Sequence, residues 1–419
     1  MSSVSIPHSS HQSSHTDSSY PRNAYDDLLK MLVRPDRRQT QARHHRQRQP
    51  LIRRRHADNP QQQPQHLSVN KYLASFFIFV VVSLYTFMHV GMSSNAAGNQ
   101  DAQSFHYQFE TLAGYFKQSD ADTDDASFDF IKEKFGLISR SYSTETGTAG
   151  SLTQWERFEK HIRQLDEQSA ADESVKVLFL GRHGQGWHNV AETKYGTPAW
   201  DCYWSLLDGA DGITWSNANL TELGQGQAKD VNALWKELLG EGIPSPETFY
   251  VSPLTRTIET ADLSFKGVPF AEVKEYKPFI KELVREALGV HTCDRRSKAS
   301  EIVAEFPHVT LEPSFSEEDV LWKADYREPR LARRYRLKLL LDDIFDSDKG
   351  VFLSLTSHSG AIRSILEGVG HRDFGLQTGG VIPVVVKAKR IKAEREKPPE
   401  EPSEGPPACK EPPSGDLQS

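Results

Sequence analysis

The chain has 419 residues, of which 37% are apolar, enough to bury the core of one large domain or two small ones with chain left over for tails. Its three cysteines exclude a disulfide-dense scaffold, although Cys202 and Cys293 could form one bridge in an oxidising compartment or could both remain thiols. The net charge of −7 is unevenly distributed: residues 1–71 hold twelve Lys/Arg and five Asp/Glu and so carry +7, which leaves −14 on the remainder.

Residues 1–71 form a basic arm rich in Ser, His, Gln, Arg and Pro, with few apolar side chains. Such a segment cannot bury enough apolar surface to offset the entropy lost on ordering, so we expect it to be disordered. A basic arm can attract anionic lipid or nucleic acid. Because an apolar segment follows directly, we interpret this arm as a signal for membrane topology, and we expect no nucleic-acid partner.

Residues 72–92 are 21 residues without Asp, Glu, Lys or Arg. At 1.5 Å per residue they match a hydrocarbon core of about 30 Å, which predicts a transmembrane helix and a membrane as partner; a buried core helix is the alternative. Arg53–Arg55 and Lys71 precede the segment, and the first cation after it is Lys117. The positive-inside rule therefore places the N-terminus in the cytoplasm and the rest of the chain in a lumenal or extracellular space. If the segment does not span, the chain would be cytoplasmic.

After a linker at residues 93–113, residues 114–392 are expected to form one domain. The spacing of Trp155, Phe158 and Ile162 predicts a helix over 152–168, and the apolar run Val175–Leu180 is typical of a strand buried on both faces of a parallel sheet. Further strands are expected at 248–253, 351–360 and 379–391, and further helices at 220–239 (with Thr221 as N-cap), 254–265, 327–345 and 361–369.

The alternation of strands and helices predicts an α/β fold: a three-layer sandwich with a mostly parallel central sheet and helices on both faces, plus the N-terminal transmembrane helix. Residues 393–419 are rich in Pro and Glu and are expected to be a disordered tail. Trp200 and Trp204 are expected to pack in the core more than to line a pocket. The Asn219–Thr221 sequon would be glycosylated only if the domain faces the lumen, so it is a test of topology.

Reactive polar residues follow three of the predicted strands directly. Arg182 and His183 follow the first, Arg256 the second and His358 the third. Because ligands of parallel sheets bind beyond the carboxyl ends of the strands, we expect these side chains to gather at one edge. A fourth group, at 285–297, carries Arg285, Glu286 and His291 and is expected beside them.

This set of side chains suits phosphoryl transfer. Paired guanidiniums match the oxygens of a phosphate dianion, and a neutral imidazole can attack phosphorus. A second imidazole can stabilise the charge on the equatorial oxygens, and a carboxyl group can protonate the departing oxygen and later deprotonate water. Side chains supply every step, so we expect no metal and no cofactor. The spacing of His291 and Cys293 is only a weak zinc signal.

Four motifs resemble those of the histidine phosphatase superfamily, in its phosphoglycerate mutase-like branch. They are RHGQGWHN at 182–189, SPLTRTIET at 252–260, REALGVHTCDRRS at 285–297 and SHSGAIRSIL at 357–366, within a resemblance that spans about Gly114 to Lys389. The resemblance implies that His183 is the nucleophile that becomes phosphorylated and that Glu286 is the general acid and base. It also implies a phosphate pocket formed by Arg182, Asn189, Arg256 and His358, to which Gly360 lends a backbone amide.

One departure bears on the reaction. Gln185 occupies the position, two residues after the histidine, where glycolytic mutases carry an acid. The difference favours a phosphatase that hydrolyses a small phosphomonoester over the first alternative, phosphoglycerate mutase-type transfer. A catalytically inactive, membrane-tethered binding module is the second alternative. His188, Arg285 and His291 are expected near the site without an assigned role.

Overall fold

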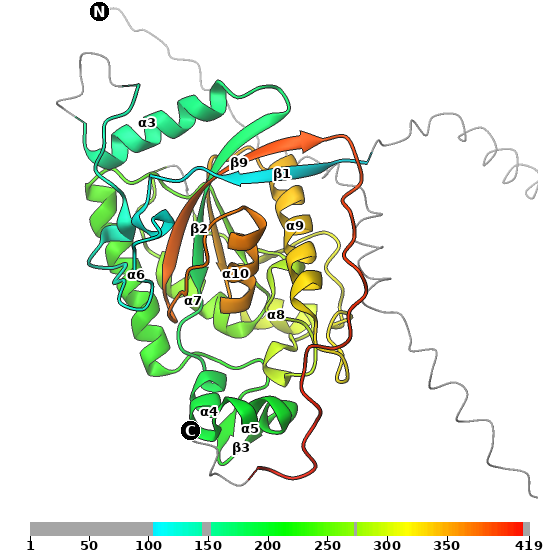
Figure 1. Ribbon diagram of the computed structural model, residues 1–419. Coiled ribbons are helices and arrows are strands. Elements are labelled where there is room, and N and C mark those ends of the chain that lie inside the picture. The colour runs from blue at the N-terminus through cyan, green and yellow to red at the C-terminus, as the bar shows by residue number, and fades with distance from the viewer. Residues whose placement is uncertain (1–103, 145–151, 272–274, 414–419) are drawn as a thin grey trace, which may run out of the picture. The chain divides into compact units, whose positions relative to one another are not determined.

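The computed structural model describes residues 104–144, 152–271 and 275–413, which Figure 1 shows in colour. The predicted basic arm at 1–71 and the predicted transmembrane helix at 72–92 lie outside these residues. No helix within the described ranges is both long and apolar enough to cross a membrane.

The domain is built on a seven-stranded sheet in the order β1-β9-β2-β8-β5-β6-β7. β2, β8, β5, β6 and β7 pair in parallel, whereas β9 is antiparallel to both β2 and β1. The strands are β1 (His106–Thr111), β2 (Glu173–Arg182), β5 (Thr248–Val251), β6 (Phe279–Ile280), β7 (Thr310–Leu311), β8 (Phe352–Ser357) and β9 (Val381–Ile391), and a separate two-stranded sheet holds β3 (Gly209–Ala210) and β4 (Ile213–Thr214). The predicted α/β fold with a mostly parallel sheet is confirmed.

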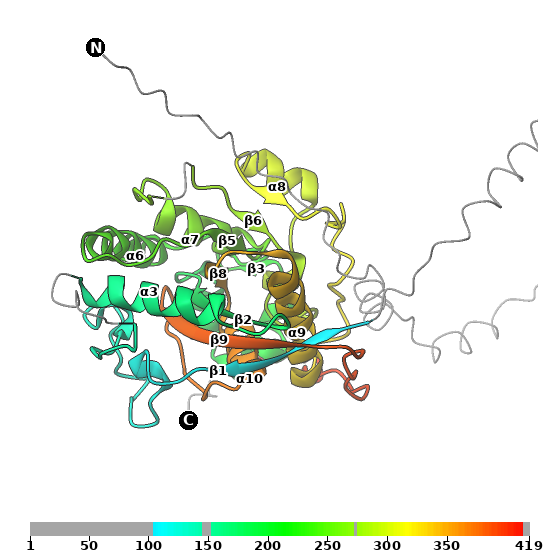
Figure 2. The same cartoon turned by 90° about the horizontal axis from the view of Figure 1, so that it is seen from above.

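Helices cover both faces of this sheet. The α-helices are α3 (Gln154–Glu167), α4 (Trp187–Tyr195), α5 (Thr197–Cys202), α6 (Glu222–Gly240), α7 (Thr255–Phe265), α8 (Ala299–Glu305), α9 (Arg330–Ser347) and α10 (Ser359–Gly368). Short 3₁₀ turns lie at Lys117–Ser119, Lys134–Gly136, Trp204–Leu206, Glu282–Val284 and Thr292–Asp294. Seen from above, α6 and α7 lie on one side of the sheet and α9 on the other (Figure 2).

β2 shows why both faces must be covered. Val177 and Phe179 belong to one apolar cluster with side chains of α3, α6 and α7, whereas Leu178 and Leu180 belong to a second cluster with α9 and α10. Alternate side chains of a strand point to opposite faces, so a continuous apolar run needs helices on both. The expectation from Val175–Leu180 is therefore met, with all six residues buried.

The helix starts follow their capping residues. Thr153 precedes α3 and accepts a hydrogen bond from the Glu156 amide at 3.2 Å, while the Glu156 carboxylate accepts one from the Thr153 amide at 2.7 Å. Thr221 caps α6 as predicted, accepting from the Gly224 amide at 3.1 Å.

The predicted linker at 93–113 needs correction. Residues His106–Thr111 form β1, an edge strand that pairs antiparallel with β9 through six residue pairs. Tyr107 and Phe109 pack against Phe345 of α9, with ring centroids 6.1 and 5.3 Å from it. The strand was missed because its pairing partner, β9, lies almost 280 residues further along the chain.

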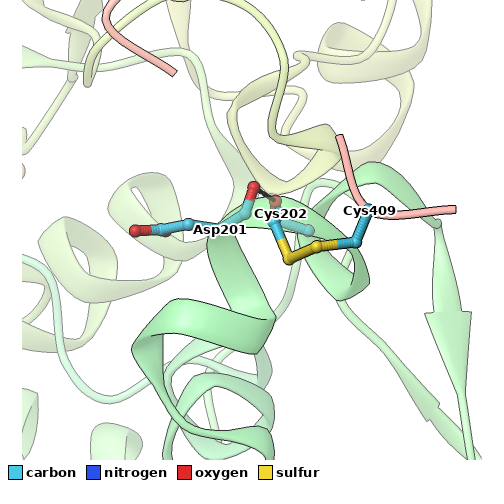
Figure 3. The surroundings of a disulfide bond; sticks show 4 residues. Asp201, Cys202 and Cys409 are labelled. Atoms are coloured by element: carbon cyan, nitrogen blue, oxygen red, sulfur yellow. Dashed lines mark hydrogen bonds between the residues drawn. A yellow bond between two sulfur atoms is a disulfide. The ribbon is translucent and has the colours of Figure 1, made fainter. Parts of the chain in front are cut away.

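The predicted disordered tail at 393–419 also needs correction. Residues 393–413, here called the C-terminal strap, leave β9 and run along the domain to α5, the red trace of Figure 1. There Cys409 forms a disulfide with Cys202, and the Cys409 amide donates to the Cys202 carbonyl at 2.7 Å (Figure 3). Cys293 is a buried free thiol, so the Cys202–Cys293 bridge left open by the sequence does not form. The amino-acid composition of the segment predicted disorder, because composition carries no information about individual long-range contacts such as this disulfide.

Beyond the carboxyl edge of the sheet, α4, α5, β3 and β4 form a small unit, here called the cap (residues 187–214). Trp200 is buried against Trp215 beside Cys293, which matches its expected packing role. Trp204 is partly buried and stacks on Tyr195, with ring centroids 4.0 Å apart.

Candidate active site

The topology brings the predicted reactive residues to one edge of the sheet. β8 lies between β2 and β5, and Arg182, the last residue of β2, pairs in register with Ser357, the last residue of β8. His183 and His358 follow these two residues directly. Arg256 lies in the first turn of α7, which begins four residues after β5 ends. Three parallel neighbours therefore present their carboxyl ends, and the residues after them, at the same place.

His183 and His358 lie close together and are buried. Their ring centroids are 5.1 Å apart, and the ring of His188 from α4 is 5.2 Å from His183. The three rings are therefore close enough to contact the same small ligand. His188, which had no assigned role, completes a group of three imidazoles.

One hydrogen bond determines the tautomer of His183. Its Nδ1 lies 2.7 Å from the Gly184 carbonyl oxygen. Because a carbonyl only accepts, Nδ1 carries the proton, and the lone pair of the neutral ring is on Nε2. Burial, together with the positive charges of Arg256 and Arg182, holds the pKa of His183 well below its usual value. The ring is therefore neutral at pH 7, as a nucleophile requires.

The other two imidazoles are also held neutral. Burial, followed by the charge of Arg256, lowers the pKa of both His188 and His358 well below the usual value. Nε2 of His358 lies 2.8 Å from the hydroxyl of Ser252, which follows β5. Ser252 is the first residue of the motif at 252–260, but the sequence alone did not indicate its contact with His358.

Two guanidiniums are held beside these rings. Arg182 donates through Nη1 to the Leu376 carbonyl at 2.7 Å, and Arg256 donates to the Cys293 carbonyl at 2.6 Å and to Asp294 Oδ1 at 2.9 Å. Several buried nitrogens remain without a hydrogen-bond partner within the described part of the chain: Nε of Arg182 and Arg256, and Nδ1 of His188 and His358. Buried polar groups are rarely left unpaired, so such a concentration at one edge is typical of a ligand site.

Glu286 is oriented by backbone amides. Its Oε1 accepts from the Ala287 amide and its Oε2 from the Gly360 amide, both at 2.9 Å. Gly360 was expected to lend this amide to the phosphate, and that expectation needs correction because the amide is already used to hold Glu286. A Cβ on Gly360 would lie 2.3 Å from Glu286 Oε1, so glycine is needed for this close approach.

Three other expected neighbours have structural contacts. Arg285 is fully buried and donates to Glu282 at 2.7 Å and to both oxygens of Asp319 at 2.8 and 2.6 Å. Asn189 accepts from the Gly186 amide at 3.0 Å through its Oδ1, at the start of α4. His291 Nε2 lies 3.7 Å from Asp201 Oδ1. Arg285 is thus held by carboxylates.

Asp294 and Arg327 were not identified from the sequence. Asp294 is buried between two guanidiniums, with Oδ1 2.9 Å from Arg256 Nη2 and Oδ2 2.8 Å from Arg327 Nη1. Burial alone would raise the pKa of Asp294, but Arg327 and Arg256 lower it to about 2. Their contact joins residues 38 and 33 positions apart, and no local pattern signals it.

A cluster of possible metal ligands lies beside this ion pair. Ligand atoms of His291, Cys293 and Asp294 all lie within 4.8 Å of one another. Both oxygens of Asp294 already accept from guanidiniums, and those positive charges disfavour a cation there. Burial, followed by the charge of Arg327, lowers the pKa of His291 to about 4.

Comparison with known proteins identifies the family. The family model of the histidine phosphatase superfamily (branch 1) matches residues 208–378. A probable phosphoglycerate mutase of Arthroderma benhamiae is 50% identical over 281 residues, which cover 67% of this chain and 84% of that relative. The chain belongs to the histidine phosphatase superfamily, in its phosphoglycerate mutase-like branch.

Two further relatives carry similar names. A probable phosphoglycerate mutase of Saccharomyces cerevisiae is 37% identical over 257 residues, covering 56% of this chain and 86% of the relative. The phosphomutase-like protein 3 of Candida albicans is 40% identical over 212 residues, covering 50% of this chain and 65% of the relative. Members of the histidine phosphatase superfamily are generally enzymes that act as phosphatases or mutases.

Proposed function

We propose that this histidine phosphatase hydrolyses a small phosphomonoester through a phosphohistidine on His183. The observation that carries the proposal is the state of His183, whose Nδ1 is bonded to the Gly184 carbonyl so that the neutral ring keeps its lone pair on Nε2. Arg182, Arg256, His188 and His358 surround this ring with buried nitrogens that a phosphate dianion would satisfy.

The first step is transfer of the phosphoryl group to the protein. Nε2 of His183 forms a bond to phosphorus while the bond from phosphorus to the ester oxygen breaks. Glu286, in its protonated form, donates its proton to the leaving oxygen. Arg182, Arg256 and His358 stabilise the charge that develops on the equatorial oxygens.

The second step releases phosphate. Glu286, now a carboxylate, takes a proton from water while the water oxygen bonds to phosphorus and the bond from phosphorus to His183 breaks. Glu286 thus recovers its proton and His183 its lone pair. The Ala287 and Gly360 amides support this double role, because they keep the carboxyl group in one orientation through both steps.

The test is the variant His183→Ala with a generic aryl phosphate as substrate. We expect turnover to fall at least about 1,000-fold, because the nucleophile is lost. His371→Ala is the matched control: His371 is also buried with Nδ1 2.8 Å from a neighbouring carbonyl, that of Arg372, but it lies beyond the far end of α10. Undiminished turnover in His183→Ala would end the proposal.

The names of the relatives favour a second candidate, phosphoglycerate mutase-type transfer. The same residues serve it, since the phosphoryl group on His183 would return to a substrate hydroxyl in place of water. The two reactions differ in how well the site excludes water. Incubation with a phosphorylated sugar acid distinguishes them: a phosphatase yields free phosphate, and a mutase yields the isomeric phosphoester.

We also propose that residues 72–92 span a membrane and that the catalytic domain is lumenal or extracellular. The Cys202–Cys409 disulfide supports an oxidising compartment, because cytosolic thiols are generally kept reduced. The sequon residue Asn219 is exposed at the domain surface, where a glycan could be accommodated.

A further inference from the structure

The C-terminal strap is fastened to the domain at three points. Near its start, Arg395 donates to both oxygens of Asp342 at 2.9 and 2.6 Å and to the Tyr107 carbonyl at 2.7 Å. Near its end, Cys409 is bonded to Cys202 of α5. Between these points the strap is hydrogen-bonded to the backbone of Arg327. This third contact is the one that is connected to the active site, through the side chain of Arg327.

The backbone of Arg327 is bonded to the strap through both its amide and its carbonyl. The Arg327 amide donates to Ser403 Oγ at 2.9 Å, and the Glu404 amide donates to the Arg327 carbonyl at 3.1 Å. The hydroxyl of the preceding residue, Tyr326, donates to the Glu401 carbonyl at 3.3 Å. The strap thereby restrains the main chain on both sides of the Arg327 side chain.

The Arg327 side chain connects this contact to the phosphate pocket. Its Nη1 is 2.8 Å from Asp294 Oδ2, and the other oxygen of Asp294 is 2.9 Å from Arg256 Nη2. Asp294 is buried, so little solvent screens the two ion pairs. The position of Arg327 therefore biases the position of the guanidinium that faces the imidazoles.

The same Nη1 also supports the loop that follows Glu286. It donates to the Ala287 carbonyl at 2.9 Å and to the Gly289 carbonyl at 2.8 Å. Gly289 has a φ of +82°, and a Cβ there would lie 1.9 Å from the Tyr326 carbonyl oxygen. The loop is thus seated directly on the segment that the strap restrains.

The end of the strap is tied to the cap. Cys202 is the last residue of α5, and α5 follows α4, the helix that carries His188 and Asn189. The disulfide closes a sequence separation of 207 residues between the cap and the strap. One end of the restraint therefore lies on α5, the helix that follows the one supplying the third imidazole; Figure 3 shows the disulfide itself.

We propose that Arg327 is a positioning residue of the active site and that the strap, held by the Cys202–Cys409 disulfide, keeps it and the cap in the phosphate-binding arrangement. The inference rests on the proposed function, because it concerns the same pocket. Opening the disulfide frees the strap, loosens the main chain at Arg327 and lets Asp294 and Arg256 move away from the incoming anion.

The experiment measures the affinity of the purified full chain for inorganic phosphate by calorimetry, which requires no turnover. We expect Cys409→Ser to weaken this affinity roughly tenfold, as small displacements of binding groups do, and to raise KM for an aryl phosphate by a similar factor. Ala408→Ser is the matched control, because it adds the same hydroxyl at the exposed neighbouring position and leaves the disulfide intact. A mild reductant should weaken phosphate binding by wild type but not by Cys409→Ser.

Arg327 is tested separately. We expect Arg327→Ala to weaken phosphate binding at least about tenfold and Arg327→Lys to recover part of it, because lysine keeps a charge near Asp294 but does not reproduce the shape of the guanidinium whose Nη1 bonds Asp294 and both carbonyls. If Cys409→Ser does not fold, reduction of the folded wild type, followed by thiol counting, provides the same comparison. Phosphate affinity within twofold of wild type after verified reduction, or in folded Arg327→Ala, would overturn the proposal. A wild-type chain that binds no phosphate would instead contradict the phosphate pocket itself, and this proposal with it.

Discussion

At the residue scale, the site is a set of neutral imidazoles held between fixed positive charges. Burial lowers the pKa of His183, His188 and His358, and the charge of Arg256 lowers it further. The pocket also holds buried nitrogens that have no hydrogen-bond partner among the described residues. A phosphate dianion would give these nitrogens acceptors beside two guanidiniums, so under the proposed function we expect the pocket to favour doubly charged ligands.

Gly360 provides a test of how Glu286 is positioned. In Gly360→Ala the new Cβ would approach Glu286 Oε1 to 2.3 Å, so the carboxyl group must move away. We expect kcat to fall about 10- to 100-fold, because a displaced acid no longer meets the leaving oxygen. Alanine favours a helix over glycine, so the loss should not come from unfolding of α10. Steady-state kinetics beside Ser359→Ala, an exposed neighbour, measures it; equal kcat in both would contradict the assignment.

The buried histidines predict how stability depends on pH. The pKa of His291 is about 4 in the folded protein, lowered by burial and then by Arg327. In the unfolded chain it is about 6.5, so below that pH the unfolded state binds more protons and the free energy of unfolding falls as pH falls. The loss should be about 1.4 kcal/mol per pH unit for each such histidine between pH 6.5 and its folded pKa.

Urea unfolding at intervals from pH 7.5 to 5 measures this dependence. We expect His291→Gln to flatten the slope by about one proton, because glutamine does not titrate. A free energy of unfolding that stays level or rises as the pH falls to 5 would show that these imidazoles are not held neutral.

At the element scale, β2 both forms the core and presents the site. Its apolar side chains alternate between the two clusters, and its last residue, Arg182, begins the proposed phosphate pocket. A strand buried on both faces is rigid, so the residue that follows it, His183, inherits a well-defined position. The His183 amide continues the ladder by donating to the Ser357 carbonyl at 3.0 Å.

Phe179 tests the contribution of this strand to stability. It is 1% exposed, and its ring lies 5.0 Å from that of Trp235 and 6.1 Å from that of Phe135. We expect Phe179→Ala to lower the free energy of unfolding by about 3–5 kcal/mol, since it leaves a cavity between β2 and α6. Leu223→Ala, at a 57% exposed position on α6, should change it by less than about 0.5 kcal/mol. Denaturant unfolding of the two variants measures both changes, and equal free energies of unfolding would contradict the prediction.

At the scale of the whole molecule, the two ends of the domain are held by partners far away in sequence. β1 pairs with β9, and the strap is tied to α5 across 207 residues. Such closures restrict the unfolded chain and so favour the folded state, with disulfides of this kind contributing about 2–5 kcal/mol. The closure at Cys202 and Cys409 also requires an environment that keeps the disulfide oxidised.

Glycosylation at Asn219 tests the proposed topology. Asn219 is exposed, and its side-chain Nδ2 donates to Glu259 Oε1 at 2.9 Å. The sequence holds no other Asn-x-Ser/Thr sequon. If the domain is lumenal, the full chain expressed in eukaryotic cells should carry one glycan that an endoglycosidase removes. Asn219→Gln should lack it, whereas Thr221→Ser keeps both the sequon and the N-cap and should retain it. Absence of the glycan together with free thiols at Cys202 and Cys409 would place the domain in the cytoplasm.

The sequence by itself determined the class of fold and several of the reactive residues that gather at one edge of the sheet. Hydrophobic period is a local property, so β2, β5, β8 and β9 and the long helices could be predicted from it. The reactive residues His183, Arg256 and His358 could be predicted because His183 and His358 directly follow a strand, Arg256 lies five residues after one, and parallel strands share one carboxyl edge.

Only the tertiary structure decided which polar groups hold one another. The use of the Gly360 amide by Glu286, the bridge from Arg256 through Asp294 to Arg327, and the disulfide between Cys202 and Cys409 all join residues more than 30 positions apart. Short strands such as β6, with only two residues, have too few side chains for a periodic signal. Their pairing depends on neighbours that the folded chain alone brings together, which is the physical reason the sequence could not reveal them.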